Sequence, residues 1–297
     1  MAPNINGVEI EDTFAEAFKM WGTRVIVTAK NHKWALQAAS TMTGFATSII
    51  GCKCEAGIER ELDHTPDGRP GFSVLFFTPS KDDLPKRLLD RVGQCIMTCP
   101  TTACFNGLSA PDRISIGGQL RYFGDGYQTS KVLDGRRFWR IPVMEGEFLI
   151  EDKLGIQSSV GGGNFLMLGE DAEVTLDAAE RAIEAMRQVR GVIMPFPGGI
   201  VRSGSKTSSR YKFLHASTND VFCPTLRGVV ESALPEGVNS VLEIVIDGLD
   251  VTVVEQATRV GILAACIPGI RRISAGNYGG TLGQFKIELH KVLELTR

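Results

Sequence analysis

An approximate internal repeat of strand, helix and strand constrains the fold of this chain more than any other sequence feature. Residues 165–199 run from an apolar strand through an amphipathic helix and a short strand into the loop PFPGG. Residues 241–280 repeat this order and end in GNYGG, so each copy finishes with an aromatic residue and two glycines. Apolar periods of about two and about 3.6 residues predict the strands and the helices. The repeat therefore indicates a duplicated fold.

The first half of the chain follows a similar order, β-α-β-β-α-β. The pattern predicts helices that begin at Asn31 and Leu84, and strands at 24–29, 47–51, 72–78 and 119–123. A possible capping box, Thr13 to Glu16, predicts a short helix before them. This is the split βαβ order of ferredoxin-like units. The expected fold class is therefore α+β, with two ferredoxin-like lobes related by duplication, at residues 1–148 and 149–297.

Composition and charge exclude several classes of function. With 43% hydrophobic and 22% charged residues, the chain has enough apolar surface to fold, which excludes a disordered protein. A net charge of −2 gives no bulk basic field for nucleic acid, and no apolar run reaches the ~20 residues of a membrane helix. The seven cysteines form no pair of CxxC motifs, so the sequence predicts no metal site. This cysteine usage, with no signal-peptide pattern at the N-terminus, predicts a reduced, cytoplasmic protein.

Glu243 is the first candidate for chemistry, because it interrupts the apolar strand VLEIVI at 241–246. A carboxylate at such a position lies either on a solvated edge of the sheet or in an apolar environment that raises its pKa. The strand pattern alone leaves both alternatives open. In the second case, a neutral glutamic acid is a good general acid.

The basic segment 199–220 is the second candidate. It contains four basic residues, among them Arg202 and Lys206, and no acidic residue before its last position. In a chain of slightly negative charge this surplus indicates an anionic ligand, with a solvated basic loop as the alternative. The segment contains no adjacent Gly-Lys pair, which excludes a Walker A phosphate loop. Ser217 and Asn219, in the polar turn that ends the segment, are candidate substrate contacts, with an Asx-type loop as the alternative.

Nine stretches, in order and almost from end to end, resemble one known family. They are NGVEIEDTFAEAF (6–18), HKWAL (32–36), TPDGRPG (65–71), FGDGYQ (123–128), GGNF (162–165), PFPGGIV (195–201), STNDVFCPT (217–225), LEIVIDGL (242–249) and ISAGNYGG (273–280). The family is formylmethanofuran:tetrahydromethanopterin formyltransferase, an enzyme of one-carbon metabolism in methanogenic archaea and methylotrophic bacteria. Because the resemblance covers nearly the whole chain, it is more specific than any single motif.

The resemblance implies a fold, an assembly and a reaction. It implies two ferredoxin-like lobes in each subunit of a homo-oligomer, commonly a tetramer, with a cleft at a subunit interface. The reaction is reversible transfer of a formyl group from formylmethanofuran to N5 of tetrahydromethanopterin, by direct attack in a ternary complex. Both carriers are co-substrates, and the resemblance implies no metal and no tightly bound cofactor. It also implies no nucleic-acid or membrane partner.

The resemblance and the chemistry of the reaction it implies together assign site residues. The family's key acid matches Glu243, which we expect to deliver a proton to the oxyanion or to the leaving amine. The Gly-Gly loops are expected to approach the substrates closely and to present backbone N–H groups. The substrate-binding residues expected on these grounds are Phe196, Gly198, Gly199, Arg202, Lys206, Ser217, Asn219, Asn277, Tyr278 and Gly279.

The alternative function is a non-catalytic, carrier-binding subunit of a larger formyltransferase complex. A mutated Glu243 or a broken Gly-Gly loop would favour this alternative, and the sequence contains neither. A double displacement through a formyl-cysteine is a further enzymatic alternative. It requires an activated thiol, and no cysteine has an obvious base beside it in the sequence.

Overall fold

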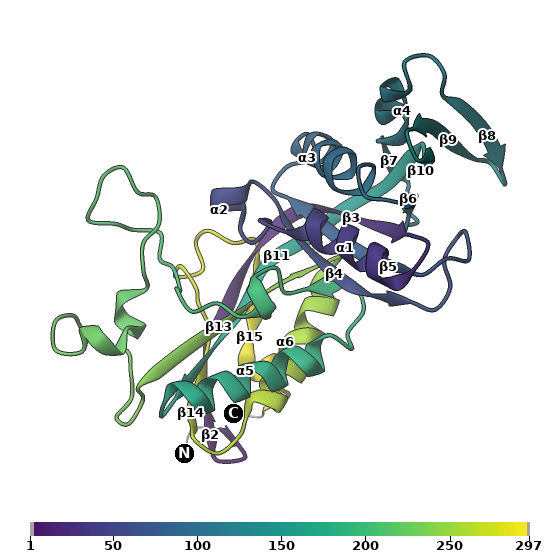
Figure 1. The fold of residues 1–297 in the computed structure, drawn as a ribbon. Helices are drawn as coiled ribbons and strands as arrows, with labels where there is room; N and C mark the ends of the chain where they lie inside the picture. Colours follow the sequence, from purple (N-terminus) through teal and green to yellow (C-terminus); the bar gives the residue numbers. More distant parts are fainter. Residues whose placement is uncertain (1–2, 296–297) are drawn as a thin grey trace. The chain divides into compact units, whose positions relative to one another are not determined.

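The computed structural model of the chain describes residues 3–295 (Figure 1). Sheets carry most of the architecture and helices pack on them, so the α+β class is confirmed. Within the described part of the chain, no helix is long and apolar enough to cross a membrane.

Contacts divide the chain into two compact units. One unit contains the described residues up to Lys19 together with those from Val160 onward, and Met20–Ser159 form the other. Two long strands, β3 (Phe14–Thr28) and β11 (Lys153–Gly169), contribute residues to both units. The division differs from the predicted boundary between residues 148 and 149, because the N-terminal strands pair with the sheet of the second half.

The unit that contains the N-terminal strands and the second half is built around one sheet and two long helices. Its elements, besides parts of β3 and β11, are β1 (Asn4–Ile5), β2 (Val8–Ile10), α5 (Ala172–Met186), β12 (Val192–Ile193), β13 (Ser240–Gly248), α6 (Val251–Ala265), β14 (Ile270–Ser274), β15 (Phe285–Glu288), α7 (Leu289–Val292) and three 3-10 turns, η3 (Pro197–Gly199), η4 (Asp220–Phe222) and η5 (Pro224–Leu226). The strands lie in the order β12-β13-β11-β14-β2-β1. The segment between η3 and β13 lies beside the sheet, away from α5 and α6 (Figure 1).

The unit Met20–Ser159 has a comparable sheet with an extension. Its further elements are α1 (His32–Thr43), α2 (Ile49–Cys52), β4 (Glu55–Leu62), β5 (Gly71–Thr78), α3 (Asp83–Arg91), the π-helical turn η1 (Val92–Ile96), β6 (Ala103–Asn106), β7 (Asp112–Ser115), α4 (Gly117–Leu120), η2 (Arg121–Gly124), β8 (Thr129–Leu133), β9 (Arg136–Val143) and β10 (Gly146–Glu151). Across the sheet the order is β4-β5-β3-β6-β10-β9-β8.

The same strand order recurs in both units. When β11, β12, β13 and β14 are numbered 1 to 4 along the chain, they lie as 2-3-1-4, and β3, β4, β5 and β6 lie in the same way. All neighbouring pairs within these two sets are antiparallel. A helix follows the first and the third strand of each set.

Three predicted elements are wrong. Residues 14–16 form the start of strand β3, and Thr13 precedes it, so no helix begins here. Residues 49–51 lie in helix α2, which Ser48 caps by accepting the Ile50 N–H, and the strand of this region is β4. Residues 119–123 lie in α4 and η2, so the fourth strand of the set is β6. For residues 13–16 the sheet pairing of β3 overrides the local helix signal, and in the other two cases a short apolar run does not distinguish a strand from a helix.

Candidate active site

Glu243 lies on the face of β13 that is opposite to helices α5 and α6. Ile244 and Ile246 are fully buried in the core that these helices form, and side chains alternate along a strand, so Glu243 belongs to the other face. Its neighbour on one edge is Leu166 of β11. On the other edge, Val201 exchanges two backbone hydrogen bonds with Glu243, of 2.8 and 2.9 Å. The strand is therefore held on both sides.

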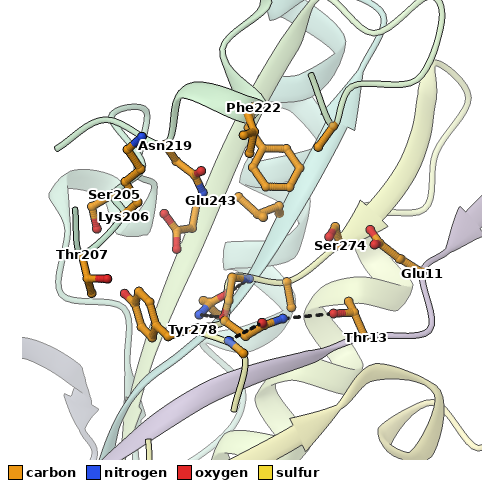
Figure 2. Close-up of a pocket in the computed structure, with 18 of the residues that line it drawn as sticks. Glu11, Thr13, Ser205, Lys206, Thr207, Asn219, Phe222, Glu243, Ser274 and Tyr278 are labelled. Atoms are coloured by element: carbon orange, nitrogen blue, oxygen red, sulfur yellow. Dashed lines mark hydrogen bonds between the residues drawn. The ribbon is translucent and has the colours of Figure 1, made fainter. Parts of the chain in front are cut away.

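A pocket of about 670 Å³ lies against this face of the sheet (Figure 2). Its size is that of a small-molecule site. Six of the predicted site residues line it, namely Glu243, Lys206, Asn219, Asn277, Tyr278 and Gly279. Figure 2 shows the Glu243 carboxyl between the segment that carries Lys206 and the ring of Tyr278. A smaller pocket of about 280 Å³ adds Arg202 and shares Glu243 and Asn219 as lining residues.

The Glu243 carboxyl is half-buried and has no hydrogen bond or ion pair with any other described residue. Burial removes water that would stabilise the charge, and it raises the pKa of this group from the ordinary value of 4.5 to about 7. Of the two alternatives for this strand glutamate, the structure therefore places it in a pocket with a raised pKa. Near neutral pH such a group is available both as an acid and as a base.

Four predicted substrate-binding residues do not line either pocket: Phe196, Gly198, Gly199 and Ser217. The Ser217 hydroxyl donates to the carbonyl of Ser208. Gly199 is buried, with φ +91°, and a Cβ at this position would lie 2.4 Å from the side chain of Ile183. This glycine is therefore required by packing against α5. The substrate contacts of these four residues stay predictions.

The basic segment is partly neutralised within the unit. Nζ of Lys206 lies 2.7 Å from a carboxylate oxygen of Asp220, and this hydrogen bond lowers the pKa of Asp220. A pair of backbone hydrogen bonds between Lys206 and Ser217 closes residues 207–216 into a loop within the segment. Arg202 is exposed and has no ion pair among residues 3–295. It is therefore a free cation near Glu243.

The backbone N–H groups of Tyr278, Gly279 and Gly280, in the loop after β14, already have acceptors within the protein. The N–H groups of Tyr278 and Gly280 donate to the carboxylate of Glu16, at 2.6 and 3.0 Å. The N–H of Gly279 donates to the side-chain oxygen of Asn277. In the other Gly-Gly loop the N–H of Gly199 donates to a backbone carbonyl, that of Phe196. These donors are not available to an oxyanion.

Three polar residues that shape the pocket are absent from the predicted site. Glu16 and Asn164 hold the loop after β14, and Glu11 lines the pocket beside Thr13. The signal for Glu16 is the same as for Glu243, since each carboxylate has an apolar residue on either side of it in its strand. The predicted capping box from Thr13 to Glu16 instead assigns it to a helix start.

No group of three or more His, Cys, Asp or Glu side chains within residues 3–295 is arranged to hold a metal ion. All seven cysteines are free thiols. Burial raises the pKa of the Cys104 thiol and raises that of Cys266 to about 12, which makes both poor nucleophiles.

Two family models together match almost the whole chain. The model described as formylmethanofuran-tetrahydromethanopterin formyltransferase matches residues 3–143, and the model of the proximal lobe of the same family matches residues 146–292. The chain belongs to the formylmethanofuran-tetrahydromethanopterin formyltransferase family. Similarity to individual members of this formyltransferase family extends over the full length. A curated relative of that name from Methylococcus capsulatus is 58% identical, over 97% of this chain and 99% of the relative.

Two solved structures of the formyltransferase family have the same fold. The enzyme from Methanosarcina barkeri is 47% identical, with a TM-score of 0.93, over 98% of this chain and 100% of that one. A chain of the formyltransferase/hydrolase complex from Methylorubrum extorquens, in complex with methylofuran, is 52% identical with a TM-score of 0.96, over 99% of both chains.

Proposed function

We propose that this chain transfers a formyl group from formylmethanofuran to N5 of tetrahydromethanopterin, with Glu243 as the general acid. The observation that carries the proposal is the Glu243 carboxyl itself. It lies in a pocket with a pKa raised to about 7 by burial, without a partner among the described residues, in a chain of the formyltransferase family.

The chemistry requires one proton to move from one nitrogen to another. The lone pair of N5 attacks the formyl carbon, and the carbonyl becomes a tetrahedral oxyanion. Glu243 in its neutral form protonates the amine nitrogen of methanofuran, and the bond between this nitrogen and the formyl carbon breaks. The resulting carboxylate accepts the proton that N5 loses, which restores the starting state. A pKa near 7 suits both halves of this cycle.

Side chains, not the loop backbone, complete the proposed site. Among the polar side chains of the loop, that of Tyr278 has no hydrogen bond with another described residue, whereas those of Asn277 and Thr281 do. Burial raises the pKa of its hydroxyl, and the negative charges of Glu243 and Glu16 raise it further. It therefore stays protonated and can donate to the oxyanion. We propose that Asn219, Lys206 and Arg202 bind the two anionic carriers.

Incubation of the purified chain with formylmethanofuran and tetrahydromethanopterin tests the proposal directly. Formation of the formyl-pterin, followed by its absorbance, is expected for the chain alone. Glu243→Gln is expected to form the product much more slowly. No product from the unaltered chain, at saturating concentrations of both carriers, would contradict the proposal.

One observation favours the second candidate, a carrier-binding subunit. A relative from Methylorubrum extorquens, 52% identical to this chain, is named as a subunit of a formyltransferase/hydrolase complex, and the solved structure from that organism is of the complex. Activity of the isolated chain distinguishes the two candidates, because a subunit that only binds carriers has none. We propose that the isolated chain is active and forms a homo-oligomer, in keeping with a tetramer.

We propose further that the two units are ferredoxin-like lobes that arose by duplication. The support is the shared 2-3-1-4 antiparallel order, with a helix after the first and the third strand. A tightly bound cofactor is not needed for the proton transfers above, and the two carriers act as co-substrates. The cytoplasmic location, with no nucleic-acid or membrane partner, stays a prediction.

A further inference from the structure

Glu16 lies at the centre of the loop that forms one wall of the pocket. Its side chain is 1% exposed, on strand β3. One carboxylate oxygen accepts the N–H groups of Tyr278 and Gly280, and the other accepts those of Leu282 and Gly283 at 2.5 and 2.6 Å. Four backbone donors from six consecutive residues thus converge on one buried carboxylate.

These hydrogen bonds keep Glu16 ionised. Burial alone raises the pKa of a carboxyl group, but the four N–H donors outweigh it and hold the pKa of Glu16 below its ordinary value. The close approach also requires glycine, since a Cβ at Gly283 would lie 2.7 Å from the Glu16 side chain and 2.6 Å from the carbonyl of Ala17. The loop is therefore wrapped around a negative charge.

Two further contacts fix the start of the same loop. The side-chain oxygen of Asn164 accepts the N–H of Gly276 at 2.6 Å. The side-chain amide of Asn277 donates to Thr13 and to the carbonyl of Phe14, as the dashed line to Thr13 in Figure 2 shows. Asn277 is thus committed to the protein, and the Tyr278 hydroxyl remains as a side-chain donor beside Glu243.

We propose that Glu16 is a positioning residue for formyl transfer. It acts by holding the loop so that the Tyr278 side chain lies beside Glu243 in the pocket. This inference rests on the proposed function. The negative charge matters as well as the shape. A glutamine has one acceptor oxygen, so its NH₂ group would face two of the four N–H donors and push that part of the loop away. An aspartate keeps the charge but is one methylene shorter, so it is expected to hold the loop in part.

A double-mutant cycle tests whether Glu16 acts through Tyr278. We expect Glu16→Gln and Tyr278→Phe each to lower kcat about 10- to 100-fold, the effect of one lost charge-assisted hydrogen bond, with little change in KM. The kcat of the double variant is expected to be no lower than that of the more impaired single variant, because both changes remove the same contribution of Tyr278. Glu16→Asp is expected to recover part of kcat, and it takes the place of Glu16→Gln in the cycle if that variant does not fold.

The matched control is Glu151→Gln in the other unit. Glu151 is 2% exposed and accepts hydrogen bonds from Arg136 and from the N–H of Asn106, so it is a buried structural carboxylate of the same kind. We expect Glu151→Gln to lower the melting temperature and to leave kcat unchanged. Additive losses in the double variant, or equal kcat losses for Glu16→Gln and Glu151→Gln, would overturn the positioning role.

The same measurements separate this inference from the proposed function. If Glu243→Gln keeps its kcat while the cycle of Glu16 and Tyr278 is non-additive, the acid role fails and the positioning role stands. If Glu243→Gln loses activity and Glu16→Gln does not, the acid role stands and the positioning role fails.

Discussion

A carboxyl group inside an apolar strand is costly unless the protein compensates its charge or leaves it neutral. This chain uses both solutions in one unit. Glu16 is ionised and surrounded by four N–H donors, whereas Glu243 has no partner within the described residues and its pKa is raised to about 7. The first arrangement stabilises a loop and the second supplies a titratable group.

Glu243→Gln is expected to preserve the fold and lower kcat by about 10²–10⁴-fold, the usual contribution of a general acid. Glutamine keeps the shape of the side chain but cannot deliver a proton. In the unaltered chain kcat is expected to fall as pH rises through about 7, because the neutral form is lost. Steady-state kinetics with both carriers saturating measure these effects. The control is Glu173→Gln, the same change at an exposed position of α5. Near-normal kcat in Glu243→Gln would reject the acid role.

The same substitution has an expected effect on stability. Between pH 4.5 and about 7 the folded chain binds more protons at Glu243 than the unfolded chain does, so this group lowers stability as pH rises through that window. Glutamine has no charge to bury. We expect Glu243→Gln to melt about 2–4 °C higher than the unaltered chain at pH 8, with a smaller difference at pH 5. Thermal melts at the two pH values measure it, and an equal difference at both would show that the pKa is not raised.

The sequence predicts Glu243 as a site residue but does not predict Glu16, for a reason that lies in the neighbouring residues. Both have apolar neighbours on either side in their strands, and only the interpretation of residues 13–16 as a helix start hid Glu16. The four N–H donors of Glu16 lie at least 262 residues further along the chain, and no local pattern indicates them. The pocket position of Glu243 likewise depends on Val201 closing the edge of β13.

At the scale of elements, the sequence predicts the surplus of basic residues in segment 199–220. It does not predict the ion pair that neutralises part of this positive charge. Asp220 stands at the end of the segment, and the hydrogen bonds between Lys206 and Ser217 fold it back onto Lys206. Helix α2 and the turn η2 were also missed, because short apolar runs do not distinguish a strand from a helix. Long elements with a clear period, such as α5 and β13, were predicted correctly.

Arg202→Ala is expected to raise KM about 3- to 10-fold and to change kcat less, because an exposed charge that binds an anion contributes equally before and during the reaction. Lys206→Ala is expected to raise KM as well, and it also leaves Asp220 without its cation. Steady-state kinetics for each carrier provide the measurement. Arg181→Ala, which removes an exposed arginine from α5, is the control. An unchanged KM for both carriers in both variants would indicate a solvated loop.

Two adjacent glycines in η3 give a matched test of packing. Gly198→Ala introduces a side chain at φ +66° into open space, and we expect it to lower the free energy of unfolding by about 1–2 kcal/mol. Gly199→Ala has a similar backbone cost and also contacts Ile183, so about 2–4 kcal/mol is expected. Denaturant unfolding of both variants measures the difference. Equal losses would mean that α5 moves aside without cost.

At the scale of the whole molecule, the expected homo-oligomer leads to a prediction about dilution. If the active cleft lies between subunits, the isolated subunit is inactive. We expect specific activity to fall as dilution converts the oligomer to monomer, with the two changes following the same concentration dependence. Sedimentation and initial-rate measurements over one concentration series test this. Constant activity per subunit in a preparation shown to be monomeric would contradict it.

The separation between Glu16 and its donors has a consequence for synthesis on the ribosome. Met20–Ser159 are contiguous, so this unit is complete once the first half of the nascent chain has emerged. Glu16 leaves the ribosome earlier still, yet Gly283, 267 residues later, is needed to complete its set of hydrogen bonds. At about 5–20 residues per second, this interval lasts about 15–50 s. The wall of the pocket that carries Tyr278 is therefore among the last parts of the protein to form, and a chain terminated before it contains all of Met20–Ser159 but no complete pocket.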